Sequence, residues 1–442
     1  MTLGEIMNIG VIGLGFVGLS ISSVLASKNY NVVGIDIDKQ KCSDIRNGVL
    51  PLFEPDLENT LRIGLKKKLT ISNNFSLIKN CDIIFVTVGT PQKSNGAIEL
   101  SMIKKATTTI GQIIRKSKKN SIIFIKSTVV PGTTQNVILP ILEKESGKKV
   151  NRDFGVISNP EFLQESNAIR DTKYPHAIVL GGKQSKYMKK AKMFFSKMHP
   201  NVPIVITNFQ TAEMIKYANN SFLATKISFI NQLSNICQNI PGTNIDDIAK
   251  IIGLDPRIGK LFLNAGPGYG GSCLPKDINA LINFANKIGV NPILLNAVKN
   301  TNREQVSNIV SLMKKILGDI TSKRITILGT AFKPNTDDIR DSKSIELIKK
   351  LLKNKAKIII HDPKAIENTK KIFGEKILYT KSIADALNKS QCVIIMTHWK
   401  QYDTLNNNSI KHMNKKNIID CRRVLVKKEL DAKYYAIGIG KN

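Results

Sequence analysis

A glycine-rich segment near the start of the chain restricts the possible folds more than any other feature. The segment GLGFVG (13–18) follows an apolar stretch, 8–12, and leads into a helix-like stretch that ends at Ser27. A second apolar stretch, 32–35, ends at Asp36. Glycines at this spacing between a strand and a helix let a pyrophosphate approach the backbone, and the acidic residue accepts hydrogen bonds from a ribose. The segment therefore predicts a dinucleotide site, and Asp36 favours NAD over NADP because a carboxylate repels a 2′-phosphate.

The regions after this segment repeat an alternation of apolar stretches and helical patterns. Strand-like stretches at 82–88, 121–126 and 154–158 each end in polar residues, proline or glycine. A second series, without a GxGxxG segment, has strand-like stretches at 324–329, 357–360, 392–396 and 417–419. Between the two series, 211–239 and 291–316 are typical of long helices. We therefore expect an α/β protein with two Rossmann-like, doubly wound parallel-sheet domains joined by a long central helical region.

The composition restricts the partners and the location of the protein. The formal net charge is +32, but the lysines are spread over nearly every segment with few aromatic residues among them, so we expect no nucleic-acid partner. The chain has no apolar stretch of about 18 residues and no signal peptide, so we expect no membrane contact and a cytoplasmic location. The six cysteines form no CxxC pair and have no zinc spacing with the five histidines, so we expect reduced thiols and no metal site.

A cysteine-containing segment, GPGYGGSCLPKD (266–277), is a candidate for covalent chemistry. Its four glycines indicate a tight loop against which another group can lie. Pro275 suits the first turn of a helix, and the apolar spacing extends that helix to about Ile288. Cys273 then lies at the helix N-terminus, where the helix dipole favours the nucleophilic thiolate. An inert, hydrophobic cysteine is the alternative, and the pattern alone leaves both open.

Polar residues elsewhere suggest further binding groups. Lys216 and Asn220 are four positions apart in the expected helix 211–239 and share a face. A solvated lysine is the alternative, although an Asn219-Asn220 pair is unusual inside a helix and favours a function. Cations that suit a ligand with phosphate or carboxylate groups follow strand-like stretches of the second series, at Lys333, Arg340, Arg422 and Arg423.

Five motifs in order along the chain resemble the UDP-glucose/GDP-mannose dehydrogenase family, and the resemblance covers almost the whole chain. They are GLGFVG (13–18), NPEFLQE (159–165), EMIKYANNSFLATKISFIN (213–231), FLNAGPGYGGSCLPKD (262–277) and AFKPNTDDIR (331–340). The resemblance implies an NAD-dependent, four-electron oxidation of UDP-glucose to UDP-glucuronate that uses two NAD⁺ per sugar. It implies three parts: an NAD-binding domain at 1–209, a central region for dimerisation and the catalytic cysteine at 210–318, and a domain that binds the nucleotide sugar at 319–442.

The resemblance also implies roles for individual residues. Cys273 matches the nucleophile, which forms a thiohemiacetal and then a thioester. Lys216 and Asn220 match the residues that stabilise an oxyanion. Glu161 and Asp277 match residues that act as a base or order water. Thr128 matches a residue close to the nicotinamide. The NAD side comprises Gly13, Gly15, Phe16, Val17, Gly18, Asp36, Lys41, Thr90, Thr128, Glu165 and Arg340. The sugar side comprises Glu161, Phe162, Leu163, Lys216, Asn220, Phe262, Asn264, Gly266, Tyr269, Gly270, Lys333 and one arginine of the pair Arg422 and Arg423, with Arg423 as the first choice. Arg257 matches an arginine that reaches the neighbouring active site, which implies a homodimer or a larger homo-oligomer.

Ser272 bears on the choice of substrate. Relatives that act on UDP-N-acetyl sugars usually carry a histidine before the cysteine, so Ser272 argues against those substrates. GDP-mannose stays an alternative because its dehydrogenases share GGSCLPKD. A catalytically inactive protein that binds nucleotide sugars is the alternative from another class, and the presence of Cys273, Lys216, Asn220, Glu161 and Asp277 disfavours it.

Overall fold

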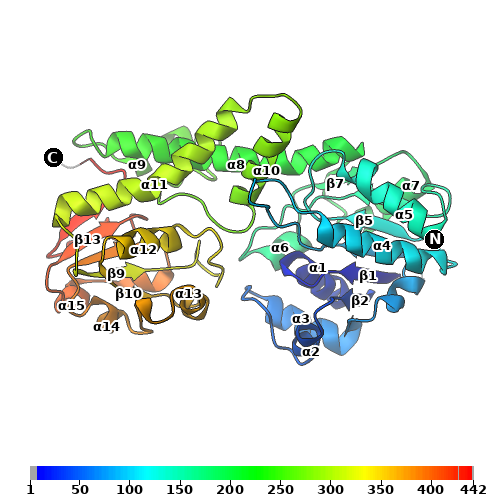
Figure 1. The fold of residues 1–442 in the computed structure, drawn as a ribbon, viewed down its shortest axis with the longest axis horizontal. Helices are drawn as coiled ribbons and strands as arrows, with labels where there is room; N and C mark the ends of the chain where they lie inside the picture. The colour runs from blue at the N-terminus through cyan, green and yellow to red at the C-terminus, as the bar shows by residue number, and fades with distance from the viewer. Residues whose placement is uncertain (1–6, 427, 441–442) are drawn as a thin grey trace. The chain divides into compact units, whose positions relative to one another are not determined.

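The computed structural model describes residues 7–426 and 428–440, which group into two compact units, Met1–Asn219 and Asn220–Asn442 (Figure 1). Each unit contains a β-sheet with helices packed on it. The three-part division at residues 209 and 318 stays a prediction. No helix in the described ranges is both long and apolar enough to cross a membrane.

The first unit is built on an eight-stranded sheet with the order β3-β2-β1-β4-β5-β6-β7-β8. Its strands are β1 (Asn8–Ile12), β2 (Asn31–Ile35), β3 (Leu69–Ser72), β4 (Ile83–Val86), β5 (Ile122–Ile125), β6 (Gly155–Ser158), β7 (Ile178–Gly181) and β8 (Ile204–Thr207). The first six are parallel in the dinucleotide-binding order 3-2-1-4-5-6. This arrangement confirms the expected fold class. One detail differs, because β7 pairs with β6 in the antiparallel direction and only with β8 in the parallel direction.

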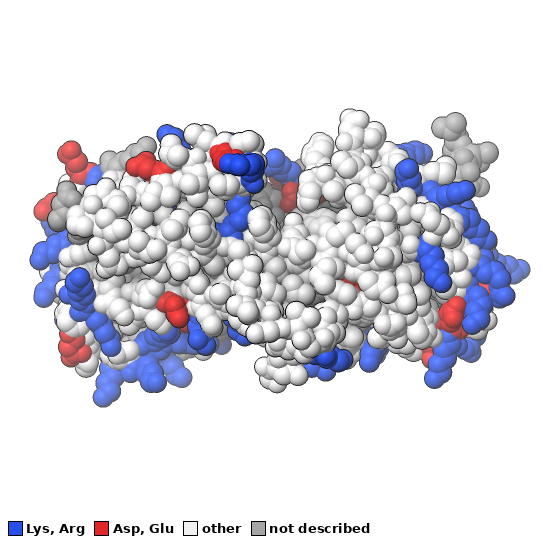
Figure 2. Space-filling view, turned by 90° about the horizontal axis from the view of Figure 1, so that it is seen from above, with Lys and Arg blue, Asp and Glu red and all other residues white. Residues whose placement is uncertain are grey.

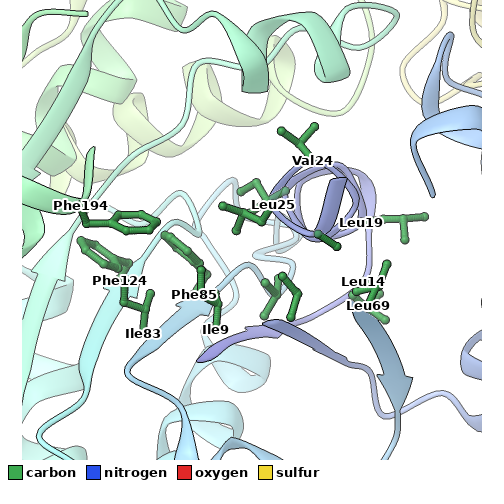
Figure 3. Packing of buried hydrophobic residues seen from close by; sticks show 14 of the residues in the cluster. Ile9, Leu14, Leu19, Val24, Leu25, Leu69, Ile83, Phe85, Phe124 and Phe194 are labelled. Carbon is green, nitrogen blue, oxygen red and sulfur yellow. The ribbon is translucent and has the colours of Figure 1, made fainter. Parts of the chain in front are cut away.

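Helices cover both faces of this sheet because its central strands are apolar on both sides. They are α1 (Phe16–Ser27), α2 (Lys39–Arg46), α3 (Leu57–Lys67), α4 (Ser101–Arg115), α5 (Leu139–Ser146), α6 (Ala168–Lys173) and α7 (Lys186–Met198). Alternate residues of β4 enter two different cores: Phe85 packs with residues of α1, α3 and α7, and Ile84 with residues of α4 and α5. In Figure 3 the rings of Phe85, Phe124 and Phe194 lie together, and Phe85 and Phe124 stack with centroids 5.1 Å apart.

The second unit has a six-stranded sheet in which all pairings are parallel and the order is β11-β10-β9-β12-β13-β14. The strands are β9 (Arg324–Leu328), β10 (Lys357–His361), β11 (Leu378–Tyr379), β12 (Cys392–Ile395), β13 (Asn417–Asp420) and β14 (Lys433–Ala436). The helices between these strands in the sequence are α12 (Lys343–Lys353), α13 (Ile366–Phe373), α14 (Ile383–Leu387) and α15 (Asn407–Ile410). In sequence terms this is the same 3-2-1-4-5-6 order as in the first unit, which confirms a second Rossmann-like sheet.

The central helices occur close to where the sequence predicts them. They are α8 (Phe209–Cys237), α9 (Ile245–Ile252), α10 (Leu274–Lys287) and α11 (Ile293–Leu317). The expected helices 211–239 and 291–316 are confirmed within two residues at each end, as is the helix that follows Cys273. The short helix α9 and the strands β3, β7, β8, β11 and β14 were not expected.

Lysine and arginine side chains do not gather in one patch on the face of the protein that Figure 2 shows. Figure 2 shows lysine and arginine side chains at many separate places on the face in view, with broad uncharged areas between them. This distribution fits a lysine-rich composition on solvated surfaces.

Candidate active site

The glycine-rich segment of the first unit forms a close turn between β1 and α1. Gly13 has a φ of +96°, and a Cβ on Gly18 would lie 1.9 Å from the Gly13 carbonyl oxygen, so a side chain at position 18 would break the turn. No side chain caps the start of α1 after Gly15. The first backbone N–H groups of a helix bind anions, so this turn and α1 fit the pyrophosphate of a dinucleotide.

Asp36 lies at the end of β2 and holds this turn in place. Its Oδ2 accepts hydrogen bonds from the Leu14 N–H at 2.8 Å and from the Lys41 ammonium group at 3.0 Å. Its Oδ1 accepts the Asp38 N–H at 3.1 Å. Asp36 is therefore fixed beside the glycine-rich turn, which is the position required of a carboxylate that binds the ribose of NAD.

Two loops at the ends of β4 and β5 are joined by side-chain hydrogen bonds, one of which the Ser127 hydroxyl donates to the Val88 carbonyl oxygen at 2.7 Å. The Thr90 hydroxyl donates to the Thr128 carbonyl oxygen at 2.7 Å. The loop after β5 is also fixed by Glu213 of α8, whose carboxylate accepts the N–H groups of Gly132 at 2.6 Å and of Thr134 at 2.8 Å. Burial raises the pKa of Glu213. The contacts of Glu213 with this loop were not predicted from the sequence.

The first unit also contains a buried ion pair between Glu161 and Lys216. The Lys216 ammonium group lies 3.0 Å from Glu161 Oε1, and the two side chains are only 4% and 9% exposed. Glu161 Oε2 accepts the Leu163 N–H at 2.5 Å, and the ammonium group lies 5.7 Å from the centre of the Phe162 ring. Glu165 is half-buried in the same segment after β6. The structure thus brings Glu161, Phe162, Leu163 and Lys216 together around one positive charge.

In the second unit, Cys273 is the N-cap residue of α10, as the sequence predicts. It is exposed, whereas the other five cysteines are buried, and its sulfur lies 3.6 Å from the Ser272 hydroxyl oxygen. Its carbonyl oxygen accepts the Asp277 N–H at 2.9 Å, which closes the first helical turn. An exposed thiol in this position has both the access and the electrostatic environment that a nucleophile requires.

Asp277 lies one turn inside α10 and is almost completely buried, with 1% exposure. Its Oδ2 accepts the Asn220 amide N–H at 2.6 Å and its Oδ1 accepts the Lys276 ammonium group at 2.5 Å. The three polar groups satisfy one another, which removes the penalty for burying a carboxylate without partners. Asp277 therefore orients the amide group of Asn220 through a direct hydrogen bond.

The glycine-rich loop before Cys273 is held by two asparagines from long helices. Asn231 of α8 accepts the Gly266 N–H at 2.7 Å. Asn302 of α11 accepts the Tyr269 N–H at 2.7 Å and donates to the Tyr269 carbonyl oxygen at 3.0 Å. Sequence analysis did not identify the two asparagines in this role, although asparagine inside a helix is unfavourable and signals such a use.

Protein atoms fill the space beside these glycines. Gly271 has a φ of +83°, and a Cβ there would lie 2.7 Å from the Phe332 ring. A Cβ on Gly270 would lie 2.4 Å from the Asp341 carbonyl oxygen. At these two positions the space beside the loop is thus occupied by the segment that follows β9. Phe262, with a φ of +64°, and the exposed Asn264 precede the loop, and Tyr269 within it is buried.

The arginines expected to bind ligand differ in their contacts. Arg423 donates to Asp246 Oδ1 at 2.7 Å, to the Ala265 carbonyl oxygen at 2.9 Å and to the Ile437 carbonyl oxygen at 3.4 Å, so every guanidinium nitrogen has a protein partner. Arg422 donates its Nε to the Met396 carbonyl oxygen at 2.9 Å. Burial lowers the pKa of Arg422 to about 10.

The remaining cations are placed near the surface. Arg340 pairs with Asp338 at 2.6 Å, and Arg257 pairs with Asp255 at 2.6 Å within an exposed turn. The Lys333 ammonium group lies 5.8 Å from the centre of the Phe332 ring.

Comparison with known protein families identifies the chain. Three domains of the UDP-glucose/GDP-mannose dehydrogenase family match it in order: the NAD binding domain at residues 7–199, the central domain at 210–304 and the UDP binding domain at 326–427. The chain belongs to this family. Among curated family members, the UDP-glucose 6-dehydrogenase of Rickettsia conorii is 39% identical, with 98% of this chain and 99% of the relative covered. UDP-glucose 6-dehydrogenase TuaD of Bacillus subtilis is 38% identical, with 97% and 93% covered.

Solved structures of family members show the same fold. A UDP-glucose dehydrogenase from Pyrobaculum islandicum superposes with a TM-score of 0.92 at 32% identity, and 99% of each chain is covered. A UDP-D-ManNAc dehydrogenase from Pyrococcus horikoshii superposes with a TM-score of 0.87 at 25% identity, with 98% of this chain and 99% of the other covered. The family membership and the NAD cofactor expected from the motifs are confirmed.

The contact between Gly271 and Phe332 leads to a testable prediction. Gly271→Ala should destabilise the protein by about 1 kcal/mol because of its left-handed backbone, and by about 1–3 kcal/mol more because the added Cβ overlaps Phe332. It should also lower activity, because the loop leads to Cys273. Gly289→Ala is the matched control, since Gly289 has a φ of +81° but no atom lies within 4 Å of the place that its Cβ would take. Urea unfolding would measure both. Equal destabilisation by the two substitutions would contradict the packing explanation, and Gly271→Ala with Phe332→Leu should recover part of the loss.

Proposed function

We propose that this protein oxidises the C6 hydroxymethyl group of UDP-glucose to a carboxylate, with two NAD⁺ reduced per sugar. The observation that carries the proposal is the exposed Cys273 thiol at the N-terminus of α10, in a chain that also contains a dinucleotide-binding turn at Gly13–Gly18. The curated relatives named UDP-glucose 6-dehydrogenase support the choice of substrate. Their coverage of nearly the whole chain supports the same activity for the whole protein.

NAD⁺, when bound, supplies the hydride acceptor for both oxidations. Residues of the first unit would bind and orient it. The start of α1 and the close turn at Gly18 would hold the pyrophosphate, and Asp36 and Lys41 would contact the ribose. Thr90 and Thr128, which are joined by a hydrogen bond, would lie beside the nicotinamide. Lys216, fixed by Glu161, would present positive charge to the oxygen at C6.

Cys273 would act in the second half of the reaction. Its thiolate adds to the C6 aldehyde carbon to form a thiohemiacetal, and oxidation of that adduct gives a thioester. Water then attacks the thioester carbon, so that the C–S bond breaks and the carboxylate and the thiol are released. The dipole of α10 stabilises the thiolate at the start and at the end of this sequence.

Asp277 would have a positioning role in this reaction. Both of its carboxylate oxygens accept hydrogen bonds, from Asn220 and from Lys276, so the carboxylate is committed to these partners. The hydrogen bond from Asn220 to Asp277 sets the orientation of the Asn220 amide group. In that orientation the amide would stabilise the negatively charged oxygen of the thiohemiacetal.

Removal of the thiol tests the covalent pathway. Cys273→Ser should release at most one NADH per site from UDP-glucose, because a serine hydroxyl is a weaker nucleophile than a thiolate and leaves less readily. Wild-type protein should release two NADH per sugar, measured by NADH absorbance with limiting UDP-glucose. Ser272→Ala, next to the thiol, should retain the ratio of two. Normal UDP-glucuronate production by Cys273→Ser would contradict the covalent mechanism. The substrate preference can be tested by measuring NADH release from a panel of sugars that includes GDP-mannose and UDP-N-acetyl sugars.

The contacts of the two adjacent arginines favour Arg422 as the residue that binds the nucleotide phosphates. Arg423 has its guanidinium group occupied by Asp246 and two carbonyl oxygens, whereas among the described residues only Nε of the Arg422 guanidinium group has a protein acceptor. Arg422 is partly buried, and a partly buried arginine with further donors suits a diphosphate. This assignment replaces the first choice of Arg423 from the sequence.

The two arginines can be separated experimentally with UDP as the probe. Arg422→Gln should weaken UDP binding by about 10- to 100-fold, which corresponds to the loss of one or two charge-assisted hydrogen bonds. Arg423→Gln should instead lower the free energy of unfolding by about 1–3 kcal/mol, because Asp246 and the two carbonyl oxygens lose their donor. Calorimetric binding of UDP and urea unfolding would measure the two effects. The reverse pattern would show that Arg423 binds the ligand.

An exposed apolar surface of the second unit supports a homodimer. Phe222, Phe229 and Ile236 of α8 are 65%, 52% and 51% exposed and are spaced by seven residues, so they form one stripe. Exposed leucines at 254 and 261 lie on either side of Arg257 in the sequence. A surface with this many exposed apolar side chains is typical of an interface, and we propose that a second copy of the chain covers it.

The dimer can be tested with a charged substitution in the stripe. Phe229→Glu should shift the protein toward monomers, since association would bury an unpaired carboxylate. Ile372→Glu is the control, because Ile372 is an exposed isoleucine on α13 outside the stripe. Light scattering after size-exclusion chromatography would give both masses. A Phe229→Glu variant that keeps the wild-type mass would contradict this surface as the interface.

A further inference from the structure

A second lysine, Lys126, lies close to the Glu161–Lys216 pair and has no role in the proposed reaction. It directly follows β5, and its side chain is mostly buried. The ammonium group donates to the Asn159 carbonyl oxygen at 3.4 Å and lies 6.0 Å from the centre of the Phe85 ring. Asn159 is two residues before Glu161, so Lys126 reaches the same loop from the neighbouring strand.

Lys126 has no carboxylate within 4 Å among the described residues, whereas Lys216 has Glu161 at 3.0 Å. The cluster thus contains two lysines and one carboxylate, that of Glu161. Burial, as the largest cause, and the positive charge of Lys216 lower the pKa of Lys126 to about 8, although Glu161 acts in the opposite direction. Near neutral pH the cluster therefore has one positive charge more than it has negative charges.

A further titratable group that interacts with Lys126 is His199, which follows α7. Burial, with the positive charges of Lys28 and Lys126, lowers the pKa of His199 to about 4. His199 is therefore neutral across the range in which Lys126 titrates. In that range the charge of the cluster changes because Lys126 titrates. The change in charge affects the nearby ion pair of Glu161 and Lys216.

We propose that Lys126 is a positioning residue whose charge, close to the Glu161–Lys216 pair, sets how much positive charge the cluster presents to the substrate oxygen. With Lys126 protonated, the cluster holds two cations and one carboxylate, and Glu161 does not balance both positive charges. With Lys126 neutral, Glu161 balances Lys216, and less positive charge remains to stabilise an oxyanion. The proposal rests on the proposed function of Lys216 in sugar oxidation.

The pH dependence of the turnover number tests this role. In wild-type protein, kcat should fall as the pH rises through about 8, where Lys126 loses its proton. Lys126→Arg keeps its charge at every accessible pH and should abolish that decrease. Lys126→Met should have a low kcat with no inflection near this pH. A structural role alone would lower kcat without moving the inflection, so persistence of the wild-type inflection in Lys126→Met would overturn the proposal.

A stability measurement tests the same titration without activity. The folded-state pKa of Lys126 is below that of an unfolded lysine, at about 10.4. The unfolded state therefore binds more protons between these values, and wild-type protein gains stability relative to Lys126→Met as the pH rises from about 8 to about 10. The difference in unfolding free energy between the two proteins should change across this window. A constant difference would overturn the proposal.

A third measurement tests whether the charges of Lys126 and Glu161 are coupled. In a Glu161→Gln background, the charge that raises the pKa of Lys126 is absent, so the lower edge of this window should move to lower pH, while the upper edge, set by the unfolded state, stays. An unchanged window would show that Lys126 does not act through Glu161 and would overturn the proposal. If wild-type protein produces no NADH from UDP-glucose, the proposed function fails, whereas these unfolding measurements still decide whether the charges are coupled.

Discussion

A carboxylate that follows the second strand fixes the turn after the first strand in both sheets, and the binding architecture depends on this interaction. In the first unit Asp36 accepts the Leu14 N–H at 2.8 Å, and the Gly13 N–H donates to the Ile35 carbonyl oxygen at 2.8 Å. In the second unit Asp362 accepts the Thr330 N–H at 2.7 Å, and the Gly329 N–H donates to the His361 carbonyl oxygen at 2.8 Å. Both turns need a glycine, because φ is +96° at Gly13 and +90° at Gly329.

The same turn has different neighbours in the two units, and this explains their different ligands. In the first unit the turn continues into glycines and an uncapped helix, which leaves backbone N–H groups for a pyrophosphate. In the second unit it continues into Ala331 and Phe332, and the Phe332 ring packs on Gly271 in the loop before Cys273. Asp362 also accepts the Trp399 indole N–H, so its carboxylate is committed to the fold. The second sheet thus supports the cysteine loop and has no dinucleotide turn.

Buried polar side chains of α8 do much of the positioning within each unit. Glu213 holds the loop after β5, and Lys216 pairs with Glu161 in the first unit. Asn220 binds Asp277 and Asn231 binds the Gly266 N–H in the second unit. Polar groups in a buried environment are tolerated when they have partners, and each of these bonds fixes a loop or a helix end. The charge balance at Glu161 and Lys216 extends this principle, because a third buried group, Lys126, changes that balance without touching the substrate.

The sequence by itself determined the dinucleotide turn, the α/β alternation, the long helices and the place of Cys273 at the start of α10. These features depend on residues close together along the chain, such as the glycine spacing at 13–18 and the proline after the cysteine. The strands that were missed are short, and β8 has only partly buried or exposed residues, so they carry little periodic signal. Their places in the sheets come from pairing with distant strands.

Only the tertiary structure decided which polar groups meet. Adjacent arginines are equivalent in the sequence, yet Arg423 turns to Asp246, which is 177 positions away, and Arg422 does not. Asn302 contacts Tyr269 across 33 positions, and Glu213 contacts Gly132 across 81. A local pattern contains no information about such partners, because their distances depend on how sheets and helices pack. The sequence therefore determined which chemical groups are present, and the packing determined which of them are committed to the fold and which remain for the reaction.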